Sequence, residues 1–514
     1  MSEILLVAVN ARYRHSSFGL RCLMANLGEF ESRALIYETT LQKSAPDIVA
    51  EILAYSPRIV GIGIYIWNVT LCTKVVALLK EQAPSITVVL GGPEVSYETQ
   101  GQPIVELADV VVCGEGEETF QRLCRTLLVD EAESAKILFG TLPTLETLAF
   151  PYRLYNEEDL AHRVVYVEAS RGCPYRCQFC LSSLDKKLRL APMDAFLAEM
   201  QGLLDRGATD FKFIDRTFNL RMDFSGAILK FFLARCVPGL SLHFEMVPDR
   251  LPEELRALLA QFPPGVVQLE IGIQSFNPEV SARIDRKQDY QALERNLAFL
   301  TTETHCHLHT DLIVGLPGES SASFAQGFNQ LLSYGPHEIQ VGVLKRLKGT
   351  PIAMHDTTCK MLYSQEAPFE ILETAAIDRS EMDRMKRFAR FWDLYPNSGN
   401  FVESTPYIWQ ETDSPYYAFM SFVDWLFGQL ERTSHISLYE LTERLFHYLT
   451  VERGLAAEAV GAAIRRDYHR APGRKTPRFL KAYGSPNEDA SKARTPQGGL
   501  ARQQRHLGIN STVS

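Results

Sequence analysis

Three cysteines lie close together in the stretch R-G-C-P-Y-R-C-Q-F-C, which begins at Arg171 and follows an apolar, strand-like run. Cys173, Cys177 and Cys180 have the spacing C-x3-C-x2-C, so one short loop could bind three irons of a cubane [4Fe–4S] cluster and leave the fourth iron open. An electron-transfer cluster normally takes four cysteines, and structural zinc normally takes four protein ligands. No fourth Cys or His lies between residues 171 and 190. The pattern therefore indicates a cluster with an open position, with a zinc knuckle or three unrelated buried thiols as alternatives.

This spacing, together with the aromatic Phe179 before the last cysteine, resembles the cysteine motif of the radical S-adenosylmethionine (SAM) superfamily. In that family the amino and carboxylate groups of SAM fill the open iron. The resemblance implies that the reduced cluster passes one electron into the sulfonium and cleaves SAM to methionine and a 5′-deoxyadenosyl radical. We therefore expect Cys173, Cys177 and Cys180 to bind the cluster, and Phe179 to lie at the SAM site.

Strand and helix signals alternate over residues 160–352, which we assign to the radical SAM domain. Together with the strand before Cys173, the further strand-like runs are 210–215, 240–247, 267–275, 307–316 and 339–347. Six βα units are too few for a closed eight-stranded barrel. We predict the partial (β/α)6 barrel of the superfamily.

Polar residues near the ends of these strands are candidate SAM contacts, because chemistry in βα barrels takes place at the carboxyl ends of the strands. Gln274, Arg286 and Asp311 resemble, in this order, a run in the oxygen-independent coproporphyrinogen oxidase branch. There the Gln and Asp contact the SAM ribose and the Arg faces its carboxylate. Asp215 lies near where the family meets the SAM amino group. Glu245 is an acid inside an apolar strand, where burial without a partner is costly, and we expect a ribose or amino-group contact.

Each of these five residues also has a structural alternative. Asp215 and Asp311 could cap helices, Gln274 could be a buried polar residue, Arg286 could be a surface residue, and Glu245 would need a partner if it were buried.

Apolar strand-like runs also alternate with helical ones over residues 1–145, which predicts a doubly wound parallel sheet. Ligands of such sheets lie outside the carboxyl ends of the strands, and glycine there lets a ligand approach the backbone closely. The candidate binding residues at these ends are Asn10, Trp67, Gly91, Gly92, Gly114 and Gly116. By itself this pattern indicates only a Rossmann-like ligand-binding domain.

Directly before a radical SAM motif, this domain resembles the cobalamin-binding domain of cobalamin-dependent radical SAM proteins, with L-G-G-P-E-V and C-G-E-G-E at matching strand ends. The signature D-x-H-x-x-G, which supplies a histidine to cobalt in many cobalamin proteins, is absent: His15 has Tyr13 rather than Asp two residues before it. The resemblance therefore implies cobalamin held without a histidine ligand. A scaffold that holds no cofactor is the alternative.

Amphipathic stretches at 416–431, 437–450 and 456–466 predict a mainly helical domain over residues 355–470. This part resembles the uncharacterised C-terminal domain of one branch of cobalamin-binding radical SAM proteins. Residues 471–514 are rich in Gly, Pro, Ser, Arg and Lys and poor in apolar residues, which predicts a disordered basic tail.

The chain has 514 residues, of which 46% are hydrophobic and 22% charged, as expected of a globular protein with about three domains. A net charge of -9 gives no reason to expect nucleic acid as the main partner. No stretch reaches the ~18 apolar residues of a membrane span, and the N-terminus lacks the pattern of a signal peptide. We expect a cytoplasmic protein with no membrane partner, in which the seven cysteines outside the motif are small buried hydrophobic residues.

The combined resemblance implies an enzyme, a cobalamin-dependent methyltransferase or oxidoreductase. We expect methylation of an unactivated carbon on an unidentified small molecule, with an electron donor such as flavodoxin or ferredoxin. The alternatives are cobalamin-linked oxidative cyclisation or rearrangement, a tRNA-modifying enzyme of the methylthiolating kind, and a non-catalytic sensor of cobalamin and cluster. Methylthiolating enzymes carry extra N-terminal cysteines for a second cluster, whereas the cysteines here fall mostly in predicted helices or strands: Cys22, Cys72, Cys113 and Cys124.

Overall fold

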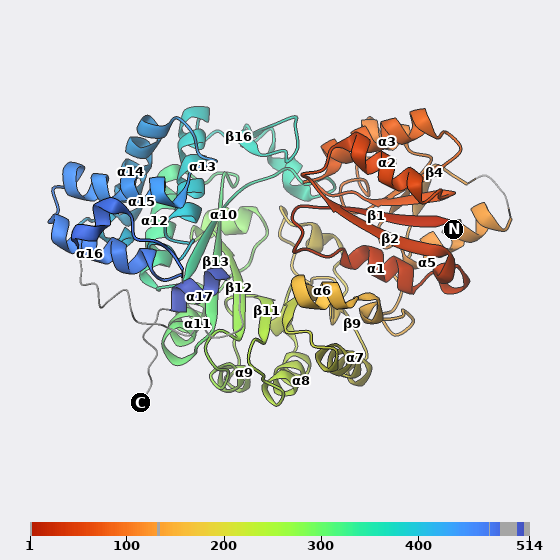
Figure 1. Ribbon diagram of the computed structural model, residues 1–514, viewed down its shortest axis with the longest axis horizontal. Helices are drawn as coiled ribbons and strands as arrows, with labels where there is room; N and C mark the ends of the chain where they lie inside the picture. The colour runs from red at the N-terminus through yellow and green to blue at the C-terminus, as the bar shows by residue number, and fades with distance from the viewer. Residues whose placement is uncertain (1–2, 131–133, 472, 484–500, 508–514) are drawn as a thin grey trace. The chain divides into compact units, whose positions relative to one another are not determined.

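The computed structural model describes residues 3–130, 134–471, 473–483 and 501–507 (Figure 1). The chain divides into two compact units. Unit 1 comprises residues 1–216, 345–353 and 363–370, and unit 2 comprises residues 217–344, 354–362 and 371–514. Neither unit is one continuous stretch of sequence.

The N-terminal part of unit 1 is a six-stranded parallel sheet in the order β2-β1-β3-β4-β5-β6. Its strands are β1 (Ile4–Asn10), β2 (Ala34–Thr40), β3 (Ile59–Gly63), β4 (Thr87–Gly91), β5 (Val110–Cys113) and β6 (Ile137–Phe139). The central strands are runs of Val, Ile and Leu because both faces of the sheet are buried. The strand order reverses between β1 and β3, which is where a doubly wound sheet binds its ligand.

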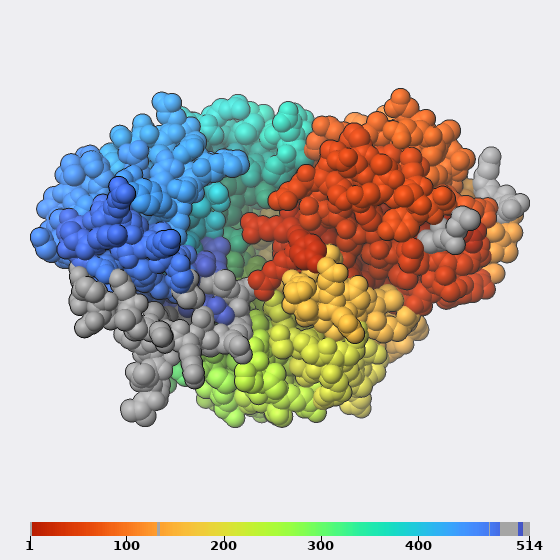
Figure 2. All heavy atoms as spheres, viewed as in Figure 1, coloured from red at the N-terminus to blue at the C-terminus, as the bar shows by residue number. Residues whose placement is uncertain are grey.

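Helices cover both faces of this sheet (Figure 1). One core contains side chains of α2 (Ala45–Ala54), α3 (Val69–Gln82) and α4 (Pro103–Leu107). The core on the opposite face contains side chains of α1 (Phe18–Ala25) and α5 (Glu117–Leu128). In the space-filling view, the red and orange atoms of this domain form a continuous mass, as a sheet packed between helices should (Figure 2). The predicted doubly wound domain is confirmed.

A buried ion-pair network joins helix α6 (Glu157–His162) to this sheet within unit 1. Arg21 Nη2 of α1 lies 2.7 Å from Asp159 Oδ2 and 3.1 Å from Glu38 Oε2 of β2. Arg163 Nη1, at the end of α6, lies 2.5 Å from Glu38 Oε2. The network fixes the point at which the chain leaves the N-terminal domain for β7.

The next sheet has six strands, in the order β7-β10-β11-β12-β13-β14. In unit 1, β7 (Val165–Val167) pairs with β10 (Asp210–Phe213) in parallel. In unit 2, the parallel pairs follow in sequence through β11 (Ser241–Met246), β12 (Val267–Gln274), β13 (His307–Val314) and β14 (Glu338–Val343). The intervening helices are α7 (Met193–Asp205), α8 (Met222–Leu233), α9 (Glu253–Leu259), α10 (Pro278–Arg283), α11 (Tyr290–Glu303) and α12 (Ser321–Ser333). Six strands with these crossovers match the predicted partial barrel.

A segment after β14, residues 345–353, belongs to unit 1 and packs against the loop that follows β4. The Lys348 ammonium pairs with Glu94, whose side chain is 4% exposed. Arg346 Nη1 lies 3.0 Å from Glu98 Oε2, and the Gly349 N–H donates to Glu98 Oε1 at 3.1 Å. We call residues 345–353 the return segment.

The C-terminal part of unit 2 is mainly helical, as predicted. Its main helices are α13 (Arg379–Leu394), α14 (Pro415–Leu430), α15 (Leu438–His447) and α16 (Ala457–Tyr468). Aromatic side chains dominate its core: the Phe388 and Trp392 rings are stacked, and the Phe419 ring packs edge-on against both. Along the described residues, no helix is both long and apolar enough to cross a bilayer.

Parts of the predicted disordered tail are helical. The structure has a short 3-10 helix, η8 (Arg478–Ala482), and a helix α17 (Ala501–Leu507). Arg502 of α17 pairs with Glu338 at 2.9 Å and with Asp393 at 2.7 Å, and so anchors α17 to β14 and α13 in unit 2. Composition alone missed α17 because this helix is held by a few specific ion pairs. The remaining predicted tail, residues 472, 484–500 and 508–514, lies outside the described residues.

Candidate functional site

The three motif cysteines lie in a loop that is closed at its base. Strands β8 (Ser170–Arg171) and β9 (Arg189–Leu190) pair antiparallel, so that Arg171 and Arg189 lie opposite one another. We call residues 172–188, between these strands, the cluster loop. Gly172 has φ 88°, and a Cβ there would collide with the Lys187 carbonyl, so only glycine fits this turn. The Cys173 N–H donates to the Asp185 carbonyl at 2.8 Å, which ties the first cysteine to the far side of the loop.

Cys173 and Cys177 are buried and Cys180 is partly exposed, and the Cys180 N–H donates to the Cys177 carbonyl at 3.1 Å. Within the described ranges, no group of three or more His, Cys, Asp or Glu side chains is arranged to hold a single metal ion. The donor set of three thiols on one closed loop fits a cubane, in which each thiolate binds a different iron. The roles of these cysteines and of Phe179 stay predictions.

Asp215 lies just beyond β10 and is 1% exposed. Its carboxylate accepts hydrogen bonds from Ser170 Oγ at 2.5 Å and from the Ala169 N–H at 3.1 Å. Burial raises the pKa of Asp215 to about 7. The side chain therefore fixes the strand that enters the cluster loop, and its predicted contact with SAM stays a prediction.

Three of the predicted SAM contacts come together in unit 2, near the carboxyl ends of β12 and β13. Gln274 ends β12 with φ 74°, a left-handed conformation that costs a non-glycine residue about 1–3 kcal/mol. Arg286 donates a hydrogen bond to the Gly272 carbonyl, and Gly272 is in register with Asp311 of β13. The structure thus brings Gln274, Arg286 and Asp311 close together, and their contacts with SAM stay predictions.

Glu245, the fourth candidate in unit 2, lies on β11 in register with Glu270 of β12, which is in register with His309 of β13. These three side chains form one partly exposed row, two residues before Gly272 and Asp311 on the same face. His243 Nε2 lies 2.8 Å from Glu270 Oε2. The sequence prediction did not include Glu270, His309 or His243, although the period-2 alternation of polar residues in these strands signals a shared face.

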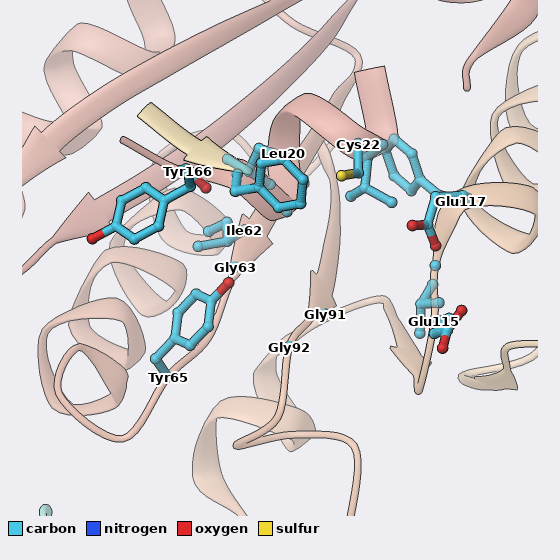
Figure 3. Close-up of a pocket in the computed structure, with 18 of the residues that line it drawn as sticks. Leu20, Cys22, Ile62, Gly63, Tyr65, Gly91, Gly92, Glu115, Glu117 and Tyr166 are labelled. Carbon is cyan, nitrogen blue, oxygen red and sulfur yellow. The ribbon is translucent and has the colours of Figure 1, made fainter. Parts of the chain in front are cut away.

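Unit 1 contains a cavity of about 650 Å³ at the carboxyl ends of the N-terminal strands (Figure 3). All six residues predicted at these strand ends line it: Asn10, Trp67, Gly91, Gly92, Gly114 and Gly116. Its wall also includes Tyr166 and Glu168 of the chain after α6, and Arg171 at the start of the cluster loop. The cavity thus extends from the sheet to the base of the cluster loop.

Aromatic rings and glycines shape one side of this cavity. The Tyr65 and Trp67 rings stack at 4.4 Å between centroids, and Trp67 is 48% exposed. Asn68 holds their loop, because its Oδ1 accepts from the Tyr65 N–H at 2.8 Å and its Nδ2 donates to the Gly63 carbonyl at 3.0 Å. Gly92 has φ 103°, and a Cβ there would lie 2.5 Å from the carbonyl oxygen of Ile64 and 3.0 Å from its backbone nitrogen. Gly92 is therefore required by loop packing, a reason the sequence did not reveal.

His15 also lines the cavity, with its Nδ1 2.6 Å from the Tyr166 hydroxyl. Burial lowers the pKa of His15, which favours the neutral imidazole. Tyr166 and Tyr65 lie toward one side of the cavity in the close-up view, and Glu115 and Glu117 lie toward the other (Figure 3).

A cluster of carboxylates surrounds Arg171 at the cavity wall. Arg171 Nη1 lies 3.0 Å from Glu115 Oε2, Arg171 Nη2 lies 2.7 Å from Glu117 Oε1, and Arg171 Nε lies 2.8 Å from Glu168 Oε2. Burial raises the pKa of Glu168. The motif C-G-E-G-E suggested its two glycines as binding residues, and nothing in the pattern signalled the ion pairs that its two glutamates make with Arg171. The partly buried position of Arg171 among three carboxylates could not be inferred from the sequence pattern.

Three family models match the chain in the predicted order. The B12 binding domain matches residues 4–124, the Radical SAM superfamily matches residues 167–330, and a protein family of unknown function, DUF4080, matches residues 358–503. Together they match most of the chain.

Two curated relatives resemble parts of the chain. It is 28% identical over 447 residues to 2-(S-pantetheinyl)-carbapenam-3-carboxylate methyltransferase of Streptantibioticus cattleyicolor, covering 76% of this chain and 64% of the relative. It is 26% identical over 298 residues to tRNA-2-methylthio-N(6)-dimethylallyladenosine synthase of Acinetobacter baumannii, covering 54% of this chain and 60% of the relative. The chain thus spans less than two thirds of either relative.

A solved structure has a similar fold over most of the chain. The cobalamin-dependent S-adenosylmethionine radical enzyme OxsB, solved with aqua-cobalamin and S-adenosylmethionine, aligns with a TM-score of 0.57 at 12% identity, covering 90% of this chain and 78% of that one. At this identity the likeness concerns the fold. The domain matches carry the family: this chain is a radical SAM protein with an N-terminal B12-binding domain, of the branch that ends in the DUF4080 domain.

Proposed function

We propose that this protein is a cobalamin-dependent radical SAM methyltransferase that methylates an unactivated carbon of a small molecule. One observation carries the proposal: the cavity at the carboxyl ends of the B12-binding sheet includes Arg171, the residue at which the cluster loop begins. Two cofactor sites that share a wall suit a reaction that needs both cofactors. When bound, the cluster and SAM supply a radical that abstracts hydrogen, and cobalamin supplies a methyl carrier.

The chain's own residues would hold and orient these groups. Cys173, Cys177 and Cys180 would bind the cluster. In unit 2, the Arg286 guanidinium suits a carboxylate, and Gln274 and Asp311 offer hydrogen-bonding groups for ribose hydroxyls.

The cavity suits the flat, largely apolar face of a corrin. Its volume of about 650 Å³ is typical of cofactor sites. The stacked Tyr65 and Trp67 rings offer a flat surface, and Gly91 and Gly114 present backbone that no side chain covers. His15, hydrogen-bonded to Tyr166, is engaged within the wall, as expected if cobalt takes no histidine.

The cluster loop also suits an acidic electron donor such as flavodoxin. Arg176, Lys186 and Lys187 are exposed on this loop, so the surface next to the cluster would be basic although the whole chain carries a net charge of -9. Such charge complementarity speeds association and fixes the orientation of partners. An oxygen-sensitive cluster and seven further thiols favour a reducing compartment, and we propose the cytoplasm.

The test uses anaerobically reconstituted protein with cobalamin, SAM and a low-potential reductant. We expect bound cobalamin together with 5′-deoxyadenosine and S-adenosylhomocysteine, because a methylase uses two SAM molecules in different ways. Cys177→Ala should lose cluster absorbance and SAM cleavage together, and retained cleavage in this variant would rule out the cluster assignment. 5′-Deoxyadenosine without S-adenosylhomocysteine would favour cyclisation or rearrangement, and no SAM cleavage would favour a sensor.

A methylthiolating tRNA-modifying enzyme is the second candidate, because one relative has that activity. The cysteines that a second cluster would need lie in separate elements and are buried: Cys22 in α1, Cys72 in α3, Cys113 in β5 and Cys124 in α5. Iron and sulfide analysis decides between the two candidates. About four irons per chain would support the proposed methylase, and about eight would support the methylthiolating enzyme.

A further inference from the structure

Glu115 joins the B12-binding sheet to both strands at the base of the cluster loop. It follows β5, and its Oε2 lies 3.0 Å from Arg171 Nη1 and 3.0 Å from Arg189 Nη1, while its Oε1 accepts from Arg189 Nη2. Arg171 and Arg189 lie opposite one another in the β8–β9 register. One carboxylate from the N-terminal domain therefore bridges both strands.

A series of contacts continues from Glu115 to the first motif cysteine. Arg189 Nη2 lies 2.6 Å from Asp185 Oδ2, and the Asp185 carbonyl accepts the Cys173 N–H at 2.8 Å. Arg189 is 7% exposed, and its Nη1 also donates to the Pro143 carbonyl at 2.7 Å. Because these ion pairs are largely buried, removing one partner leaves the remaining charges uncompensated and destabilises the base of the loop.

The other end of this chain of contacts faces the cavity. Glu115, Glu117, Glu168 and Arg171 all line it. Three carboxylates converge on the single Arg171, so a ligand that moves one of them changes the pairing of the rest. A molecule in the cavity would touch the same groups that set the base of the cluster loop.

We propose that Glu115 is a positioning residue that couples occupancy of the cavity to the conformation of the cluster loop. The inference rests on the proposed function, in which cobalamin occupies the cavity and the loop binds the cluster. By linkage, the coupling acts both ways: cluster assembly strengthens cobalamin binding, and cobalamin orders the loop by the same free energy.

The first test measures cobalamin affinity by equilibrium dialysis, on protein with and without its reconstituted cluster. In the parent protein, the cluster should tighten cobalamin binding roughly tenfold, within the usual range of coupling between sites. In Glu115→Gln, both groups should still bind, but the affinity should no longer depend on the cluster. Glu98→Gln is the matched control, because Glu98 pairs with Arg346 and lies outside the cavity lining. It should retain the coupling.

The second test follows the loop itself in cluster-free protein. Trypsin can cleave after Arg176, Lys186 or Lys187, which are exposed on the cluster loop. Aquacobalamin should slow this cleavage severalfold in the parent. Glu115→Gln should be cleaved faster, and cobalamin should not protect it. If Glu115→Gln is recovered unfolded, Arg189→Lys serves instead, because it keeps the charge but loses the two-pronged contact with Glu115.

The outcomes separate the two proposals. If the parent binds cobalamin equally with and without its cluster, and cobalamin leaves proteolysis unchanged, the coupling is overturned while the proposed function stands. If Glu115→Gln keeps the full coupling, Glu115 is not the positioning residue. If the parent binds no cobalamin, the proposed function and the coupling both fail.

Discussion

At the residue scale, Asp215 combines deep burial with two hydrogen bonds at the entrance to the cluster loop. Its pKa is raised from 3.8 to about 7 by burial, so between these pH values the folded protein retains a proton that the unfolded chain has released. Stability therefore falls as the pH rises from about 4 to about 7.

We predict that this fall disappears in Asp215→Asn, because Asn has no carboxyl group to titrate. The measurement is urea unfolding of parent and variant between pH 4 and 7, in which the parent should lose a few kcal/mol relative to the variant. Asp130→Asn, at an exposed position in the same unit, is the control, and its free energy of unfolding should change with pH as that of the parent does. Parallel curves for parent and Asp215→Asn would contradict the raised pKa.

Gly92 allows a second prediction, because its left-handed backbone leaves no room for a Cβ beside Ile64. We expect Gly92→Ala to lower the free energy of unfolding by more than the ~1–3 kcal/mol cost of a strained backbone conformation. Gly101 also has a left-handed φ, 73°, but has nothing within 4 Å of its Cβ position. Gly101→Ala should therefore lower the free energy of unfolding only by the cost of the strained backbone conformation, ~1–3 kcal/mol. Equal losses in thermal or urea unfolding would argue against the close approach to Ile64.

Sequence order could anticipate which residues come together where strand ends decide their position, although their role in binding stays a prediction. Asn10, Trp67 and the four glycines follow strands of one parallel sheet, and such ends meet at one edge, so their convergence on the cavity could be inferred from sequence order. The partners of Arg171 could not. They depend on the β8–β9 register, which brings Arg189 opposite Arg171 across 17 intervening residues.

At the element scale, the link between β2 and α6 gives a third prediction. Glu38 accepts hydrogen bonds from Arg21 at 3.1 Å, from Arg163 at 2.5 Å and from the Ser17 N–H at 2.5 Å. Burial opposes its ionisation, but Arg21 and Arg163 outweigh burial and hold the pKa of the Glu38 carboxyl below its ordinary value. The stability contributed by this lowered pKa is present at neutral pH and is lost as the pH falls through the folded pKa.

We expect Glu38→Gln to lower the free energy of unfolding at neutral pH by about 3 kcal/mol in urea unfolding, because the buried Arg21 and the partly buried Arg163 both lose a charged partner. Glu51→Gln, which breaks the exposed pair between Glu51 and Lys43, should cost less than about 1 kcal/mol. The cost of Glu38→Gln should shrink in acid, where the parent has lost the same charge. Similar losses for the two variants would contradict a buried network.

Alternation of strands and helices made both sheets predictable, because each amphipathic or buried segment carries its own period. The helices of the C-terminal domain followed for the same reason. Helix α17, the anchored end of the tail, could not be predicted in this way. Arg502 finds Glu338 and Asp393 only after β14 and α13 have been brought together, and no local pattern near Arg502 signals those partners.

At the scale of the whole molecule, sequence order and spatial grouping diverge. We predicted domain boundaries as consecutive ranges, with the radical SAM domain ending at residue 352. The structure groups residues 345–353 and 363–370 with the first 216 residues. Periodicity is a local property of the sequence, so it predicts domains as consecutive ranges. The return segment is instead held by ion pairs with Glu94 and Glu98, about 250 positions away along the chain.

The return segment has a consequence for dissecting and synthesising the protein. A fragment that ends before residue 345 lacks the Lys348 ammonium and leaves the Glu94 carboxylate, 4% exposed in the intact chain, without that counter-ion. Unit 1 therefore cannot be excised intact at a single cut. On the ribosome, its N-terminal sheet can form early, but the loop after β4 is completed only when the return segment emerges. The N-terminal domain is therefore complete only after the strands of the barrel have been translated.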